Sequence, residues 1–225
     1  MQTLRVLGLM ASKRVSLVPG KTYHFYNHAN GNDVLFKNDG NYRYFLKKYA
    51  EYLFPTFDTF AYCLLPNHFH FLIRVKDEKT IVEALGSDPK GFLKPLGSSL
   101  RGSLSHRLAH KVGSFQNAYA KAFNKQHSRM GSLFMQSFGR KLVKDDSYYL
   151  RLICYIHLNA VHHGFVRNVS EWPYSSYHTY LTTKVTRLDR EEVLLWFGGE
   201  GNFIKFHQQG IGIDKALILE MEETP

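Results

Sequence analysis

Two histidines, His68 and His70, are the first residues of this sequence whose types and spacing could do chemistry. They lie in the segment from Pro66 to Val75, which alternates polar and apolar side chains as a β-strand does. On a strand, His68, His70 and Arg74 would share one face, and the two imidazoles could converge on a single metal ion. A pair of histidines on the solvent-facing side of a sheet would show the same spacing.

A tyrosine and an asparagine stand one helical turn apart later in the chain. The segment from Tyr148 to His162 has helical periodicity, with Tyr155 and Asn159 on a mostly polar face. A phenol there can act as a nucleophile, and an amide oxygen can bind a metal. An amphipathic helix with an exposed tyrosine is also ordinary, and the chain has 14 tyrosines. The predicted core face of this helix consists of Tyr149, Ile153, Ile156 and Ala160.

The elements that must position these residues follow from hydrophobic periodicity and turn residues. We predict strands at 21–28, 57–65, 68–75 and 138–143, and helices at 41–53, 80–85, 96–111 and 148–162. Pro66 and Asn67 would form a hairpin turn, and the polar segment 113–132 has no clear pattern. This order of elements predicts an α+β fold with a single antiparallel sheet and helices packed on it.

Composition narrows the class of protein. The chain has 225 residues, of which 44% are hydrophobic, enough for one domain with a sizeable core. Its two cysteines are too few for a disulfide framework and indicate a reducing, cytoplasmic setting. No apolar run approaches the roughly 18 residues of a membrane span, so we expect no membrane partner.

The charge is unevenly distributed along the chain. The formal net charge is +10, and residues 101–151 alone carry ten basic and two acidic residues, a net +8. From residue 185 onwards eight acidic residues outnumber four basic ones. We therefore expect the middle of the chain to meet a polyanion, and the acidic C-terminal part to cover or brace the domain.

Five short motifs, taken in order, resemble those of one family. They are Tyr-His-x-Tyr-Asn (23–27), Leu-Pro-Asn-His-x-His (65–70), Gly-x-Leu-Phe-x-Gln (131–136), Tyr-Ile-x-Leu-Asn (155–159) and Trp-Pro-x-Ser-Ser-Tyr (172–177). Across about residues 21–180 this series resembles the single-tyrosine HUH transposases, and more narrowly their REP-associated branch. The resemblance implies a ferredoxin- or RRM-like palm of the HUH endonuclease type. It divides the chain into an N-terminal tail (1–17), the HUH domain (18–180) and a small C-terminal helical extension (181–225).

The resemblance also implies a site and a reaction. Its metal ligands fall on His68, His70 and Asn159, and its nucleophile on Tyr155. A divalent ion, Mg²⁺ or Mn²⁺, would neutralise charge on the scissile phosphate. Tyr155 would attack a DNA phosphodiester, giving a 5′-phosphotyrosine intermediate and a free 3′-OH, and the strands could be rejoined without ATP. The implied function is that of a transposase and single-stranded DNA endonuclease.

The expected partner is single-stranded DNA, presented beside a hairpin, and a homodimer is left open. The candidates for contact with DNA are Arg74, Lys121, Lys125, Arg129, Gln136, Arg140, Lys141, Lys144 and Arg151. Many family members carry Arg where this chain has Ser137, so Arg140 is the substitute candidate for that basic contact. Many also follow the ligand Asn with Pro, where this chain has Ala160.

Other functions remain open at this point. A non-catalytic, RRM-like module could use Tyr23, Phe25, His68 and His70 as a surface on which bases stack. A replication-initiator or relaxase nickase would use the same histidine pair, and a host-adopted copy would cut repeats without moving itself. Tyr148, seven residues before Tyr155 on the same side of the helix, is the second candidate for the nucleophile.

Overall fold

The computed structural model describes residues 15–86, 104–143 and 146–210. Its centre is one four-stranded sheet of β1 (Thr22–His28), β2 (Phe57–Leu65), β3 (His68–Val75) and β4 (Gly139–Leu142). The strands lie in the order β2-β3-β1-β4, and each neighbouring pair is antiparallel. The predicted single antiparallel sheet is therefore confirmed, as is the β2–β3 hairpin.

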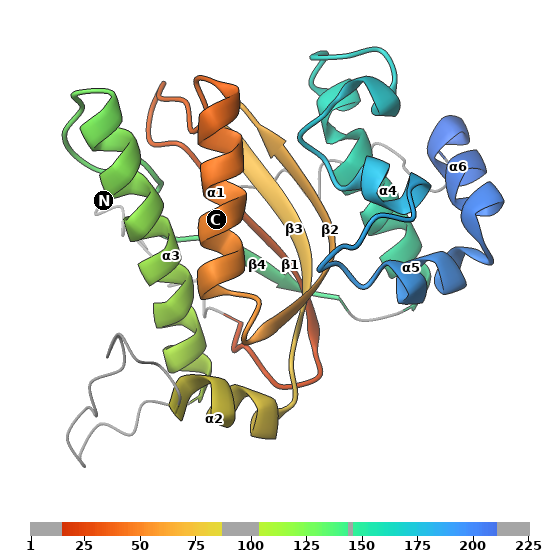
Figure 1. The fold of residues 1–225 in the computed structure, drawn as a ribbon, viewed down its shortest axis with the longest axis horizontal. Coiled ribbons are helices and arrows are strands. Elements are labelled where there is room, and N and C mark those ends of the chain that lie inside the picture. Colours follow the sequence, from red (N-terminus) through yellow and green to blue (C-terminus); the bar gives the residue numbers. More distant parts are fainter. Residues whose placement is uncertain (1–14, 87–103, 144–145, 211–225) are drawn as a thin grey trace, which may run out of the picture.

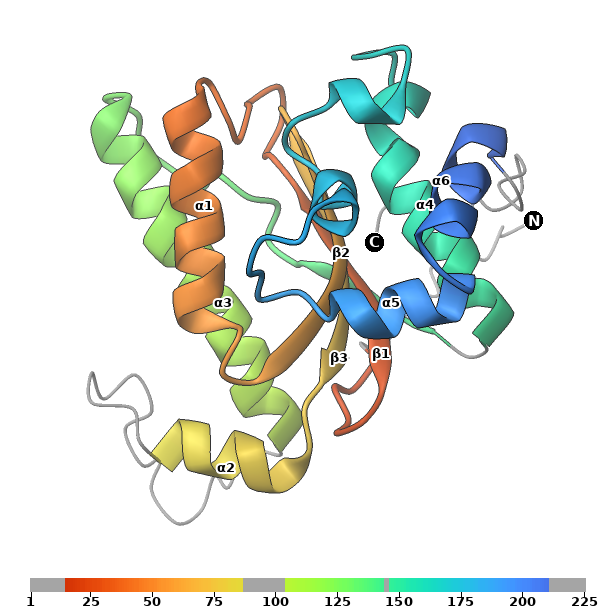
Figure 2. The ribbon, with the colours of Figure 1, turned by 45° about the vertical axis from the view of Figure 1, so that its right-hand side comes forward.

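Helices cover both faces of this sheet (Figures 1 and 2). On one face lie α1 (Asp39–Tyr52) and α3 (Leu104–Gln126), with the short α2 (Glu78–Gly86) after β3. On the other face lies α4 (Asp146–His162), and α5 (Arg190–Phe197) and α6 (Glu200–Gln209) pack beside it. Two short 3₁₀ helices, Val169–Glu171 and Tyr177–Leu181, connect α4 to α5. The α+β class is confirmed, and α4 lies between the sheet and the C-terminal helices.

The two faces of the sheet have different cores. Between the sheet and α1 and α3 the core is rich in aromatic residues, and Phe45 contacts Phe69, Phe71 and Phe115. Four aromatic residues from the segment after β3 are buried in this core: Phe115, Tyr119, Phe123 and Phe134. A second core joins the other face of the sheet, through residues such as Cys63 and Leu72, to α4, α5 and α6.

Helix α3 differs from the prediction. The segment 113–126, which has no clear pattern in the sequence, continues the helix to Gln126. Phe115, Tyr119 and Phe123 recur every four residues and pack on one side, so these aromatic rings anchor the otherwise polar second half of the helix in the first core. Residues 96–103 of the predicted helix lie outside the described residues.

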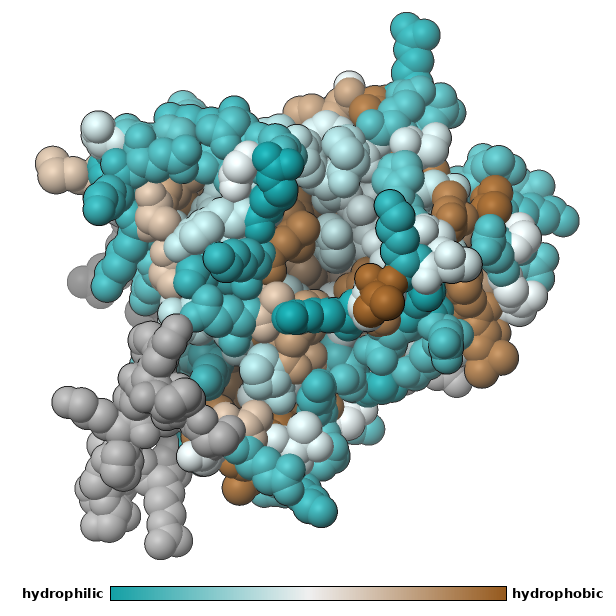
Figure 3. Space-filling view, in the orientation of Figure 1, coloured by the Kyte–Doolittle hydropathy of each residue, from teal (hydrophilic) through white to brown (hydrophobic). Residues whose placement is uncertain are grey.

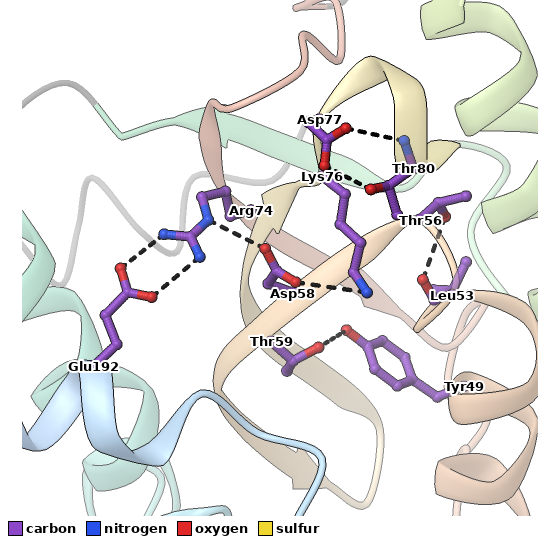
Figure 4. A network of polar contacts seen from close by, with 10 residues as sticks. All are labelled: Tyr49, Leu53, Thr56, Asp58, Thr59, Arg74, Lys76, Asp77, Thr80 and Glu192. Carbon is purple, nitrogen blue, oxygen red and sulfur yellow. Dashed lines mark hydrogen bonds and ion pairs between the residues drawn. The ribbon is translucent and has the colours of Figure 1, made fainter. Parts of the chain in front are cut away.

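An ion-pair network ties the C-terminal part to the sheet (Figure 4). Arg74 on β3 donates to Asp58 on β2 (3.2 Å) and to both carboxylate oxygens of Glu192 on α5 (2.7 and 3.1 Å). The expectation that the acidic C-terminal part braces the domain is thus confirmed for α5. At the other end of the chain, Leu17, the last residue of the predicted tail 1–17, is buried in the first core, and residues 1–14 of that tail lie outside the described residues.

A buried chain of hydrogen bonds links α6 to β2 through α4. Nδ1 of His207 donates to the carbonyl of Phe203 (2.7 Å), so its Nε2 can accept from Nδ1 of His157 (2.8 Å). The hydroxyl of Ser176 donates to Nε2 of His157 (2.7 Å) and accepts from the backbone N–H of Tyr62 (2.8 Å). Both imidazoles must be neutral for this chain to form.

We predict that His207 makes the free energy of unfolding depend on pH. Burial lowers the pKa of His207 from 6.5 to about 4. The unfolded chain therefore binds this proton more tightly than the folded protein does. Above pH 6.5, neutral His207 makes its full contribution to the free energy of unfolding. This contribution is lost as the pH falls towards 4, by roughly 1.4 kcal/mol per pH unit for this one residue. Urea unfolding across this range should give a smaller pH slope for His207→Gln than for the wild type, and equal slopes would contradict the prediction.

The surface in the orientation of Figure 1 is mainly hydrophilic, and hydrophobic side chains gather beside the C-terminal helices (Figure 3). Leu195 on α5 is one of the exposed hydrophobic residues of the described part of the chain. Within the described residues, no helix combines the length and apolar character that crossing a membrane requires.

Candidate active site

The inner face of α4 packs on the face of the sheet that carries the histidines, where polar side chains of β1 and β3 lie beside apolar side chains of β2 and β3. Both Tyr155 and Asn159 are fully buried there, as are Ile153 and Ile156 on the predicted core face. The polar side of α4 therefore does not face solvent along its middle turns. The physical reason is that β1 and β3 present polar side chains to it, including His24, Tyr26, His68 and His70.

His68 and Asn159 come together across the interface between β3 and α4. Nδ1 of His68 donates to Oδ1 of the preceding Asn67 (2.8 Å), so Nε2 of the neutral ring carries a lone pair. That Nε2 lies 3.2 Å from Oδ1 of Asn159. The Nδ2 atom of Asn159 is buried and has no hydrogen-bond partner among the described residues. Two electron-pair donors thus face each other at the point where the sequence predicts a metal.

His70 lies beside Tyr155. The ring centroids of His70 and Tyr155 are 5.7 Å apart and those of His68 and His70 are 5.2 Å apart, each pair nearly perpendicular. His70 also contacts His24, whose Nε2 lies 2.9 Å from Nδ1 of His70. One chain therefore brings its own Tyr155 and its own histidine pair together.

Burial keeps these histidines neutral. Desolvation lowers the pKa of His68 to about 3, with further lowering by His28 and His163. The pKa of His70 is also well below its usual value, because of burial first and the neighbouring histidines second. Burial, together with the charge of Lys141, lowers the pKa of His24 to about 3. Neutral imidazole is the form that binds a metal ion.

The donor set fits a divalent ion. Two ligands that each lie about 2.1 Å from one ion, at roughly a right angle, are about 3 Å apart. The 3.2 Å between His68 Nε2 and Asn159 Oδ1 is close to this separation. Among the described residues no group of three or more His, Cys, Asp or Glu side chains could hold a metal ion, so the candidate site depends on the amide oxygen.

Gly139 makes room for Tyr26 in this site. A Cβ atom at Gly139 would overlap the ring of Tyr26, which lies across from it on β1. The Tyr26 ring in turn contacts His24 and His70, with centroids 4.9 and 5.9 Å apart. A glycine on the edge strand therefore allows the aromatic packing that supports both histidines.

Gly139→Ala should accordingly destabilise the protein by about 1–3 kcal/mol, because the added methyl group overpacks a buried ring. Gly113→Ala is the matched control: a Cβ there meets no atom within 4 Å, and α3 should gain roughly 0.5–1 kcal/mol. Urea unfolding of both variants checks the opposite signs. A stable Gly139→Ala protein would contradict the packing described.

The predicted DNA contacts do not form one face. Lys121 and Lys125 are exposed on α3, which covers the face of the sheet opposite the histidines. On β4, Lys141 pairs with His24 and lies on the histidine face, whereas Arg140 pairs with Phe25 and lies on the other. Strand alternation therefore favours Lys141 over Arg140 as the basic residue next to the site.

The other candidates have varied surroundings. Arg129 forms an ion pair with Asp33, and Arg74 is held by two carboxylates, so each is already paired with acidic groups. Gln136 is exposed after α3, and Arg151 on α4 lies over the ring of Tyr148 (5.7 Å). Lys144 lies outside the described residues.

The RRM-like alternative does not agree with this arrangement. Tyr23 and Phe25 lie on the face covered by α1 and α3, whereas His68 and His70 lie on the opposite face, and all four are buried. In the described part of the chain they form no common surface on which bases could stack.

Sequence reasoning missed the histidines and the tyrosine that surround the predicted ligands. His28 stacks on His68 (4.6 Å), and His163 meets the same ring (4.8 Å). The signal for His24, Tyr26 and His28 was present, because they alternate along a strand whose residues 23–27 form one of the motifs. Only the pairing of β1 with β3 makes them neighbours of the site.

Comparisons with known proteins agree with this fold. No protein-family model matches the chain. A "Putative REP-associated tyrosine transposase" of Haemophilus influenzae is 28% identical over 122 residues, which is 54% of this chain and 60% of that protein. A solved REP-associated tyrosine transposase bound to a REP hairpin has a TM-score of 0.53 at 18% identity, and the match covers 76% of this chain and 86% of that one. The resemblance to the REP-associated branch of the single-tyrosine HUH transposases is therefore confirmed.

Proposed function

We propose that the protein is a transposase that cuts and joins single-stranded DNA through a tyrosine–DNA intermediate. The observation that carries the proposal is the meeting of Tyr155 with His70, and of His68 with Asn159, at one buried interface. A nucleophile beside a neutral N/O donor set suits phosphodiester cleavage. The curated relative and the solved structure, both REP-associated tyrosine transposases by name, support the same reaction class.

In the proposed reaction, the Tyr155 oxygen forms a bond to the scissile phosphorus and the bond from phosphorus to the 3′ oxygen breaks. The phenol proton leaves and the 3′ oxygen gains one, so a 5′-phosphotyrosine and a free 3′-OH result. His68, His70 and Asn159 would hold Mg²⁺ or Mn²⁺, which when bound neutralises charge on the phosphate oxygens. The fixed rings around Tyr155 limit its motion and keep the phenol beside the donor set.

The proposed substrate is single-stranded DNA next to a hairpin. The solved relative is bound to a REP hairpin, which supports a hairpin-bearing substrate. Lys141, on the histidine face of the edge strand β4, is the basic residue best placed to meet a strand that enters the site. Arg151 lies one turn before Tyr155 on α4 and is the second candidate, while the exposed Lys121, Lys125 and Gln136 would meet DNA that extends beyond the site.

The test is incubation with end-labelled, hairpin-bearing oligonucleotides, with and without Mn²⁺, followed by a denaturing gel. We expect a protein–DNA adduct that requires the metal, that carries a 3′-end label and that lacks a 5′-end label, because the 5′ fragment leaves with a free 3′-OH. A fully paired duplex of the same sequence is the control and should give little adduct. Absence of an adduct from every single-stranded substrate, or retention of the 5′-end label, would contradict the proposal.

A further inference from the structure

His24 is a buried residue of the site to which the proposed reaction assigns no role. It is fully buried on β1, on the same face of the sheet as His70. Its Nε2 lies 2.9 Å from Nδ1 of His70, and the two ring planes are only 14° apart. The hydrogen bond therefore joins two nearly parallel imidazoles at their nitrogens.

The direction of this hydrogen bond determines which nitrogen of His70 can bind a metal. Since both rings are neutral, only one proton lies between them. If Nδ1 of His70 donates to His24, the lone pair of His70 is on Nε2 and is available to the metal. If His24 donates instead, Nε2 of His70 carries the proton and cannot bind.

The other nitrogen of His24, Nδ1, does not fix the tautomer of the ring. Its Nδ1 is buried and has no hydrogen-bond partner among the described residues. No backbone group or carboxylate in that part of the chain thus holds His24 in one tautomer, so His24 can accept from His70 when an ion occupies the site. Metal-bound histidines generally donate their other N–H to such a partner.

We propose that His24 is a positioning residue that accepts the Nδ1 proton of His70 and thereby leaves Nε2 of His70 free for the metal. His24 acts through His70 and has no direct contact with the ion. The inference rests on the proposed function, because it takes His70 as a metal ligand. It extends the site from the hairpin motif to the neighbouring strand β1.

The test is the affinity of the full-length protein for Mn²⁺, measured by calorimetry without DNA. His24→Leu should weaken binding by about 10- to 100-fold, since it removes the acceptor. His24→Gln keeps an acceptor oxygen and should restore the affinity to within a few fold of the wild type. Thr22→Val, two residues away on the same face of β1, is the control and should bind as the wild type does. Thermal unfolding of each variant reports whether it folds.

Three outcomes would overturn the inference. Equal affinities of the wild type, His24→Leu and His24→Gln would show that His70 needs no partner. A loss in His24→Gln as large as that in His68→Ala would make His24 a direct ligand. If the wild type binds no Mn²⁺, or forms the DNA adduct only when no metal is bound, the proposed metal site is wrong whatever the variants do.

Discussion

Tyr155→Phe is expected to abolish the protein–DNA adduct, by at least roughly a thousandfold, because it removes the attacking oxygen and leaves no substitute nucleophile at that position. The phenylalanine ring fills the same buried space between α4 and the sheet, where Tyr155 meets His24 and His70 edge-on. The variant should therefore fold, bind Mn²⁺ and bind the oligonucleotide nearly as the wild type does. The measurement is adduct yield on a denaturing gel, together with DNA binding by fluorescence anisotropy.

Two tyrosines on the same helix serve as controls. Tyr148 precedes Tyr155 by seven residues and lies against Arg151, and Tyr149 packs against Trp196 of α5. Tyr148→Phe and Tyr149→Phe should both retain the adduct. An adduct that survives in Tyr155→Phe but disappears in Tyr148→Phe would transfer the nucleophile to Tyr148 and overturn the assignment.

Asn159→Leu should have opposite effects on metal binding and on stability. The substitution removes the only amide oxygen of the proposed donor set, so Mn²⁺ affinity should fall by at least about 100-fold, given that even outer-shell changes cost 10- to 100-fold. It also removes the buried Nδ2, which lacks a hydrogen-bond partner among the described residues. An unsatisfied buried donor costs about 1–3 kcal/mol, so the metal-free variant should be as stable as the wild type or more so.

Asn159→Asp keeps the side-chain oxygen and removes the amide nitrogen, so it tests the oxygen alone. The carboxylate keeps an oxygen next to Nε2 of His68 and adds a negative charge, so Mn²⁺ should bind at least as tightly as in the wild type. Calorimetry and urea unfolding on the three proteins check both signs. If Asn159→Leu binds Mn²⁺ with the affinity of the wild type, Asn159 is not a metal ligand. If the variant is strongly destabilised, the role of Asn159 is to hold α4 on β3.

Local patterns were enough to predict most of the elements. The bounds of β2 and β3 agree with the predicted strands, because both alternate or run apolar between clear turn residues. Helix α4 ends as expected, since Gly164 adopts a positive φ of 71° just beyond it. The second half of α3 was missed, because its helical signal is three aromatic rings within a polar segment.

Charge along the chain was a poor guide to charge in space. The basic segment 101–151 suggested a single surface for phosphates. In the structure its described residues are divided among α3 on one face of the sheet, β4 at the edge and α4 on the other face. Whether two neighbouring basic residues face the same way depends on strand alternation, which separates Arg140 from Lys141.

The sequence by itself determined the chemical types in the site and their order: a histidine pair on one face of a strand, and a tyrosine and an asparagine one turn apart on a helix. Periodicity distinguishes the sides of an element, but it does not say which element each side will meet. Only the tertiary structure decided that the polar side of α4 packs on the polar side chains that β1 and β3 present on one face of the sheet. That contact buries Tyr155 and Asn159 against His68 and His70, and strand pairing adds His24 and Tyr26, because burial of polar side chains requires polar partners.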